Sequence, residues 1–181
     1  IHQTAFASAE EETRPIMTGT LVLVEGGKLT LVATDTYRLA ARTAPLEDAS
    51  GQALRAVVPT RALREVQRLA GEEEAPAKVT VGSNHARFVL PDAVVTSSLI
   101  EGHFPDHTAV IPTDYHNRIR VDREALAATL RRAQVVARED GNKVVLRASD
   151  STMRIEASSP GLGQFADELT VTLEGGEVVV S

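Results

Sequence analysis

Two stretches of the sequence carry residue types that could do chemistry but lack the setting that this chemistry needs. The stretch HFPDH offers His103, Asp106 and His107, which are side chains that ligate divalent metals. Pro105 lies between them and disfavours a helix that would gather the ligands, so we expect ordinary surface polar groups in a loop. The stretch SSPGLGQ, residues 158–164, has neither the Lys-Ser/Thr ending nor the strand-to-helix setting of a phosphate-binding loop.

No Ser-His-Asp order stands out elsewhere, so we expect no catalytic residue, no metal site and no cofactor.

A third stretch, LVATDTYRLA (residues 31–40), interrupts a strand pattern with a polar corner. Asp-Gly or Asn-Gly is enough to reverse a chain, whereas this corner adds Tyr37 and Arg38. A ring and a guanidinium side by side could bind a ligand. The simpler interpretation is a polar hairpin corner with one packed tyrosine, and the stretch alone leaves both open.

Composition limits what can position these residues. The chain has 181 residues, of which 43% are apolar and only 3% aromatic, so we expect a globular core of aliphatic side chains. It has no cysteine, which excludes disulfides and thiolate metal sites. No signal peptide or membrane-length apolar run is present, so we expect a cytoplasmic protein with no membrane partner. The first residue is Ile1, from which we expect a piece of a longer protein.

Three segments repeat one pattern, in which two apolar strands flank a short turn rich in Gly, Ser, Asn or Asp. They begin at Thr20, Lys78 and Lys143. Each predicts an antiparallel hairpin, and their spacing of roughly sixty residues predicts duplicated units of strand, helix and three strands. Between the second and third units, the stretch FPDHTAVIPTDYHNRI predicts an interdomain linker, and we place the boundary near Asp114.

Helices are predicted before the second and third hairpins. Thr60 is the expected N-cap of the first helix and Gly71 its stop, while Asp122 is the expected N-cap of the second. Each helix has one apolar face, with arginines on the other side at Arg61, Arg64, Arg68, Arg131 and Arg132. A net charge of −6 argues against bulk attraction to nucleic acid, but it allows a local basic face. The alternative is an ordinary solvated face.

Three landmarks resemble the bacterial sliding clamp, the β subunit of DNA polymerase III. They are ETRPIMTG (residues 12–19), LVATDTYRLA and GHFPDHTAVIP (residues 102–112), in matching order and spacing. The resemblance covers essentially the whole chain. It implies an α+β DNA-clamp fold with antiparallel sheets outside and helices on the inner face. Residues 1–114 would be the complete middle domain, and residues 115–181 the first half of a truncated third domain.

The resemblance also implies a function. Two full-length subunits would close into a homodimeric ring around double-stranded DNA, as the non-catalytic processivity factor of DNA polymerase III. This piece would not form the ring. The partners would be the polymerase III catalytic subunit, the clamp loader, other polymerases and repair proteins, docking through a short linear motif that ends in apolar side chains. The alternative is a non-enzymatic peptide-binding module unrelated to replication.

The family's docking groove can be carried over residue by residue. By resemblance it would be formed by Arg14, Met17, Thr34, Thr36, Tyr37, Arg38, Leu39, Pro105 and Val110. Thr36 stands where many relatives have Gly, so we expect that this turn does not need a positive φ. Ala109 replaces a long basic side chain of some relatives. The arginines of the two helices would make loose phosphate contacts.

Overall fold

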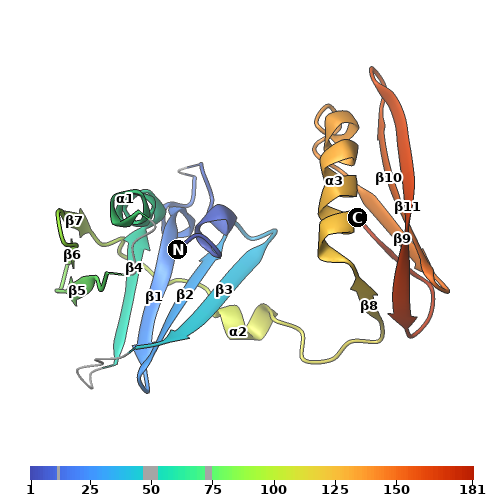
Figure 1. Ribbon diagram of the computed structural model, residues 1–181. Helices are drawn as coiled ribbons and strands as arrows, with labels where there is room; N and C mark the ends of the chain where they lie inside the picture. The colour runs from blue at the N-terminus through green and yellow to red at the C-terminus, as the bar shows by residue number, and fades with distance from the viewer. Residues whose placement is uncertain (12, 47–52, 72–74) are drawn as a thin grey trace. The chain divides into compact units, whose positions relative to one another are not determined.

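The chain divides into two compact units, each with its own hydrophobic core. They comprise Ile1–Ile111 and Pro112–Ser181, and the division lies a few residues before the boundary predicted at Asp114. The computed structural model describes residues 1–11, 13–46, 53–71 and 75–181 (Figure 1).

The first unit begins with a four-stranded antiparallel sheet of order β3-β2-β1-β4. Its strands are β1 (Gly19–Glu25), β2 (Lys28–Thr34), β3 (Leu39–Pro45) and β4 (Leu54–Pro59). Gly26 and Gly27 join β1 to β2 with φ angles of 55° and 73°, a turn that glycine adopts without steric cost. The first predicted hairpin, β1 to β2, is therefore confirmed. Strands β2 and β3 form a further hairpin, whose turn is the polar corner of residues 35–38.

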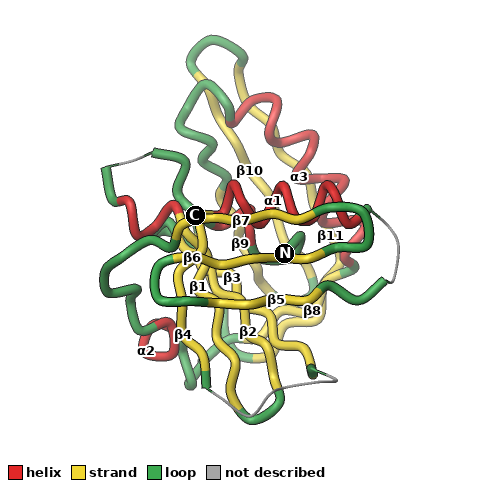
Figure 2. The backbone as a smooth tube through the Cα atoms, turned by 90° about the vertical axis from the view of Figure 1, so that its left-hand side faces the viewer, coloured by secondary structure: helices red, strands yellow, loops and turns green. Residues whose placement is uncertain are grey.

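Helix α1 (Thr60–Ala70) follows β4 and leads into a second, three-stranded sheet. The sheet contains β5 (Lys78–Val81), β6 (His85–Val89) and β7 (Val94–Ser98), which lie side by side in Figure 2. Leu63 and Val66 of α1 are buried against Val22, Val58 and Phe88, among others.

The predicted N-cap of α1 is wrong by one position. The helix starts at Thr60, its N-cap residue is Pro59, and no side chain caps it. The Thr60 hydroxyl instead lies 2.9 Å from the Thr20 hydroxyl in the core, because β1 pairs with β4 at this point and faces Thr20 toward the helix start. Gly71 does end the helix as predicted, with a φ of 63°.

Three short helical turns lie in the described part of the first unit. They are the 3₁₀ turns η1 (Ala5–Ala7) and η2 (Pro15–Thr18), and the single turn α2 (His107–Val110). The stretch predicted to be an interdomain linker therefore begins as part of the first unit. Phe104, just before α2, is 1% exposed and anchors this segment in the core.

The second unit is one five-stranded sheet of order β12-β9-β10-β11-β8 with one helix. Its elements are β8 (Arg118–Val121), α3 (Arg123–Ala137), β9 (Val145–Ser149), β10 (Thr152–Ser159), β11 (Gly163–Glu174) and β12 (Val178–Val180). The Asp122 carboxylate accepts a hydrogen bond from the Ala125 amide, so the predicted N-cap of α3 is confirmed. The stretch of residues 158–164 comprises the paired ends of β10 and β11 and the turn between them.

The expected α+β fold is confirmed. Strand, helix and three strands recur as β4-α1-β5-β6-β7 and as β8-α3-β9-β10-β11. In each unit the helix covers a sheet with aliphatic side chains, as the low aromatic content requires. No helix in the described ranges is long and apolar enough to cross a membrane.

The buried pair of hydroxyls gives the first prediction. Thr60→Val should lower the free energy of unfolding of the first unit by about 1–3 kcal/mol, because it leaves the buried Thr20 hydroxyl without a partner. Hydrogen exchange of the β1 and β4 amides measures this loss. The double variant Thr20→Val, Thr60→Val should recover most of it.

An exposed pair of threonine hydroxyls on the same sheet is the control for the buried pair. The Thr30 and Thr43 hydroxyls are 2.8 Å apart. Thr43→Val should change the same exchange rates little, since water replaces the lost partner. An equal loss in the two single variants would contradict the role given to burial.

Candidate functional site

A groove of about 420 Å³ opens in the first unit, where the β2–β3 corner faces the segment around α2. It is lined by Met17, Thr34, Thr36, Tyr37, Arg38, Leu39, Phe104, Pro105, His107 and Val110. Eight of the nine residues expected there from the resemblance line this one cavity. The segments are separated by more than sixty residues in the sequence, so only the tertiary fold brings them together.

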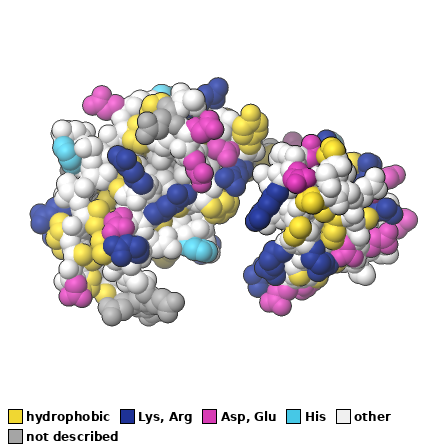
Figure 3. Space-filling view, turned by 90° about the horizontal axis from the view of Figure 1, so that it is seen from above, with side chains coloured by type: hydrophobic (Ala, Val, Ile, Leu, Met, Phe, Trp, Pro, Cys, Tyr) yellow, Lys and Arg dark blue, Asp and Glu magenta, His cyan; other side chains and the backbone are white. Residues whose placement is uncertain are grey.

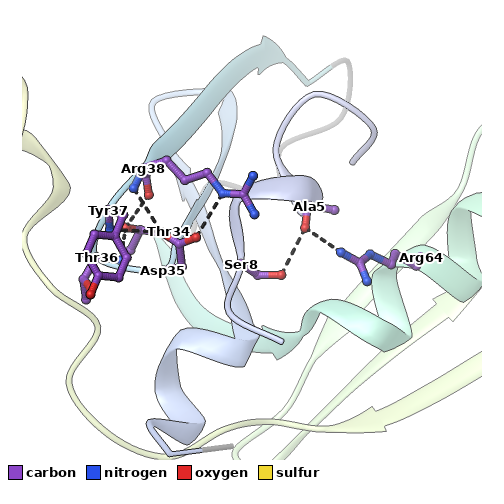
Figure 4. A network of polar contacts seen from close by, with 8 residues as sticks. All are labelled: Ala5, Ser8, Thr34, Asp35, Thr36, Tyr37, Arg38 and Arg64. Carbon is purple, nitrogen blue, oxygen red and sulfur yellow. Dashed lines mark hydrogen bonds and ion pairs between the residues drawn. The ribbon is translucent and has the colours of Figure 1, made fainter. Parts of the chain in front are cut away.

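Hydrogen bonds from two side chains shape the β2–β3 corner (Figure 4). The Thr34 hydroxyl donates to the Arg38 carbonyl at 2.7 Å and accepts from the Thr36 amide at 3.1 Å. One oxygen of the Asp35 carboxylate accepts from the amides of Tyr37 and Arg38, at 3.0 and 2.9 Å. Short polar side chains that bond the next amides in this way form a tight turn without Asn-Gly.

Thr36 contradicts the expectation for this turn. Its φ is 83°, in the region that glycine prefers, although threonine is β-branched. The Thr36 amide donates to the Thr34 hydroxyl, and the next amide, that of Tyr37, donates to the Asp35 carboxylate. These two hydrogen bonds hold the backbone of Thr36 in this conformation. The corner thus keeps the backbone shape that a glycine would give, but with strain that its neighbours must offset.

The floor of the groove is apolar. Met17 and Phe104 are 8% and 1% exposed, and Leu39 packs against the cluster that contains Phe104. The Phe104 carbonyl accepts a hydrogen bond from Arg55 Nη2 of β4 at 3.3 Å, which ties the segment to the sheet. Phe104 was not among the predicted site residues, although an apolar residue directly before Pro105 could have indicated it.

The rim of the groove exposes apolar surface to solvent. The Tyr37 side chain is 97% exposed and that of Val110 is 63% exposed. The simpler interpretation of the corner, with one packed tyrosine, is therefore wrong. An aromatic ring held on a rigid turn beside an apolar floor loses little conformational entropy when a ligand covers it.

The opposite wall is built by α2. The Asp106 carboxylate accepts from the Thr108 hydroxyl at 2.7 Å and from the Thr108 amide at 3.0 Å, and these bonds lower the pKa of Asp106 below its ordinary value. This cap fixes the turn that places His107 and Val110 on the groove. His107 also was not among the predicted site residues; its spacing of three from Val110, one helical turn, is the signal that could have found it.

The two predicted groove arginines differ in position. Arg14 is exposed just before η2, its carbonyl accepts from the Met17 amide at 2.9 Å, and it does not line the cavity. Arg38 lines the cavity, but its Nε donates to Asp35 at 2.9 Å and its Cζ lies 6.0 Å from the centre of the Phe6 ring. Figure 4 shows this guanidinium and the Tyr37 ring leaving the corner in different directions.

The charge of Asp35 matters for the corner. Partial burial opposes its ionisation, but the amides of Arg38 and Tyr37 and the Arg38 guanidinium donate to the carboxylate and outweigh that effect. The net result is a pKa below the ordinary value of 3.8. The ionised carboxylate therefore stabilises the folded corner.

The five predicted DNA-facing arginines are all exposed, and three of them have partners within the chain. Arg64 donates to the Ala5 carbonyl at 3.0 Å, Arg68 pairs with Glu65, and Arg132 pairs with Asp167. Arg61 and Arg131 have no ion-pair partner within the part of the chain that the structure describes. Figure 3 shows Lys and Arg interspersed with Asp and Glu on the visible surface, not gathered in one patch.

The described residues contain no group of three His, Cys, Asp or Glu side chains placed to hold a metal ion.

Comparison with known proteins finds one family along the whole chain. A model described as DNA polymerase III beta subunit, central domain, matches residues 1–106, and one described as its C-terminal domain matches residues 108–181. A beta sliding clamp of Staphylococcus aureus is 33% identical over 183 aligned residues, which cover 100% of this chain and 48% of that protein. The chain spans about half the length of the relatives it matches.

Solved structures agree with this result. The DNA polymerase III beta subunit of Pseudomonas aeruginosa is 29% identical and superposes with a TM-score of 0.92 over 99% of this chain and 49% of its own. The sliding clamp of Bacillus subtilis is 31% identical, with a TM-score of 0.88 over 98% of this chain and 47% of its own.

The second prediction concerns pH. Asp35→Asn should lower the free energy of unfolding of the first unit by about 1 kcal/mol near neutral pH, because it removes a charged hydrogen-bond acceptor. The difference should shrink as pH falls below 3.8, since the stabilisation from a carboxyl with a lowered pKa is lost as that carboxyl is protonated. Urea denaturation followed by circular dichroism between neutral pH and about pH 3 measures it.

Asp92→Asn, an exposed aspartate in the turn between β6 and β7, is the control and should show no such dependence. A constant difference between Asp35→Asn and the unmodified chain at every pH would contradict the role of the charge.

Proposed function

The chain belongs to the DNA polymerase III beta subunit family, and we propose that it is the part of a bacterial sliding clamp that carries the partner-docking groove. The unit Ile1–Ile111 would correspond to the central domain, and Pro112–Ser181 to part of the C-terminal domain. The whole protein would act in the cytoplasm as a non-catalytic processivity factor, which keeps a polymerase on double-stranded DNA.

The observation that carries the proposal is the shared cavity at the β2–β3 corner. Eight residues expected in a docking groove from sequence resemblance alone line one cavity of about 420 Å³. A buried apolar floor, exposed apolar rim residues and backbone held by hydrogen bonds are the features of an anchor pocket for a linear peptide. The ligand would be a short motif with closely spaced apolar side chains.

The groove residues have separable roles in this proposal. Met17 and Leu39 would contact the apolar anchor, and the flexible thioether would adapt to anchors of different shape. Tyr37 would cover the anchor from the rim. Because Asp35 and Phe6 already hold the Arg38 guanidinium, Arg38 would mainly stabilise the corner and would offer its remaining donors to peptide carbonyls.

The charge of the chain suits sliding. A clamp that moves along DNA needs weak phosphate contacts, because every tight contact must break at each step. A net charge of −6, with three of the five predicted DNA-facing arginines already bonded within the chain, leaves few cations on the helices for phosphate. We infer that enclosure by a homodimeric ring of the whole protein, rather than attraction, would hold it on DNA.

The partners would be the polymerase III catalytic subunit, the clamp loader and other polymerases or repair proteins. A peptide-binding module unrelated to replication would use the same groove, so DNA binding and the identity of the peptide distinguish the two functions.

Peptide binding is the third prediction. A labelled peptide of the pattern Gln-Leu-x-Leu-Phe should bind the chain, and Leu39→Asp or Tyr37→Ala should weaken binding at least about thirtyfold, the size of a hot-spot loss. Fluorescence anisotropy measures the dissociation constants.

Two residues outside the groove serve as matched controls. Tyr115→Ala removes the other tyrosine of the sequence, and Leu162→Asp adds the same charge at an exposed leucine in the β10–β11 turn. Both should bind as the unmodified chain does. Binding unaffected by Leu39→Asp would place the peptide elsewhere and refute the groove.

Duplex binding is the fourth prediction. The chain should bind duplex DNA weakly, without sequence preference, and lose roughly tenfold in affinity or more between 50 and 200 mM salt. Arg61→Ala and Arg131→Ala should each reduce the slope of log affinity against log salt by about 1. Arg42→Ala, which removes an exposed arginine of β3 outside the helices, is the control and should leave the slope unchanged. Tight, sequence-selective binding would contradict a clamp.

A further inference from the structure

Thr36 combines a strained backbone with a place in the lining of the groove. In the part of the chain that the structure describes, three residues other than glycine have a positive φ: Thr36 at 83°, Asn142 at 59° and Asp150 at 51°. Asparagine and aspartate adopt this region several times more often than most residues, whereas a β-branched side chain there is an outlier. Thr36 is the β-branched case, and it lines the cavity, whereas the other two residues do not.

The Thr36 side chain does little within the chain to offset this strain. The hydrogen bonds that hold the corner here involve the backbone amides of Thr36 and Tyr37, and the Thr36 hydroxyl forms no hydrogen bond with any described residue. Thr36 is also exposed, so its methyl group adds no burial to the core. A glycine would keep both hydrogen bonds without the steric cost. The fold of the corner therefore does not explain a threonine at this position.

Within the groove, the same side chain adds bulk at a fixed place. Thr36 shares the cavity with Met17 and Leu39 of the floor and with Pro105 and Val110 of the opposite wall. The backbone that carries it is held by hydrogen bonds, and a β-branched side chain has few rotamers, so its atoms cannot easily swing aside. A methyl group and a hydroxyl on a rigid corner narrow the space that a ligand can fill.

We propose that Thr36 is a size gate of the groove, which disfavours a peptide anchor as large as an indole ring relative to leucine or phenylalanine. The inference rests on the proposed function, because it names the ligand class that the same groove takes. Overfilling a packed site by a few atoms is enough to discriminate between anchors by roughly tenfold. The strain of the corner accompanies this selectivity, as strained backbone often does at binding sites.

Three N-acetylated peptide amides test the proposal. The reference is Gln-Leu-Ser-Leu-Phe, and the other two carry one tryptophan each, Gln-Leu-Ser-Trp-Phe and Gln-Leu-Ser-Leu-Trp. Isothermal titration gives the affinity of each tryptophan peptide relative to the reference. In Thr36→Gly this relative affinity should rise roughly tenfold or more for at least one of them. A general loss of binding caused by the more flexible glycine falls on all three peptides, so it cancels in the ratio.

Calorimetry measures the strain independently of binding. Thr36→Gly should raise the unfolding temperature of the first unit by a few degrees, because relief of the strain exceeds the extra freedom that glycine gives the unfolded chain. Asp150→Gly is the matched control, since it also places glycine at a positive φ but lies outside the cavity lining. It should leave the relative affinities of the three peptides unchanged.

Thr36→Val separates bulk from hydrogen bonding, because it keeps the branched shape and removes only the hydroxyl. It should keep the preference for the reference peptide, whatever its absolute affinity. Relative affinities that stay the same in Thr36→Gly, or that rise as much in Thr36→Val, would overturn the size gate. A Thr36→Gly chain that is less stable than the unmodified chain would overturn the strain argument. Failure of the reference peptide to bind the unmodified chain would instead refute the docking groove itself.

Discussion

The groove depends on how the β2–β3 corner satisfies its own backbone. Four residues reverse the chain here without a glycine, and the amides of Thr36, Tyr37 and Arg38 all find acceptors in the Thr34 hydroxyl and the Asp35 carboxylate. Those bonds hold Thr36 at a positive φ and turn Tyr37 fully into solvent. Without them the aromatic ring would pack or move, and the rim of the groove would lose its shape.

The other half of the groove is held by a different force. Phe104 is buried among Leu21, Val32 and Val57 of the first sheet, so the segment that follows it must pass beside the corner. The Asp106 cap then turns the chain and presents His107 and Val110. A hydrophobic anchor and a polar cap together fix two walls that the sequence separates by about seventy residues.

The arginines of the helices show how one residue type serves two purposes. Arg64 stabilises the N-terminal turn through the Ala5 carbonyl, and Arg132 joins α3 to β11 through Asp167. Both therefore contribute to the fold whether or not DNA is present. In the proposed clamp, Arg61 and Arg131, which have no ion-pair partner among the described residues, would carry most of the phosphate contact of the helices, which keeps that contact weak.

The sequence by itself determined the hairpins, the helices, the Asp122 cap and the aliphatic nature of the core, because turn residues, caps and apolar periodicity act over short distances. Together with the resemblance, it also predicted which residues would meet in the groove. Only the tertiary structure decided that Arg14 lies outside the cavity, that Phe104 and His107 belong to it, and that Thr60 pairs with Thr20 instead of capping α1. It also decided that Thr36 adopts a positive φ and that Tyr37 is exposed. These outcomes depend on which partner reaches a given hydroxyl, amide or ring, and those partners come from strands and turns that are distant in the sequence.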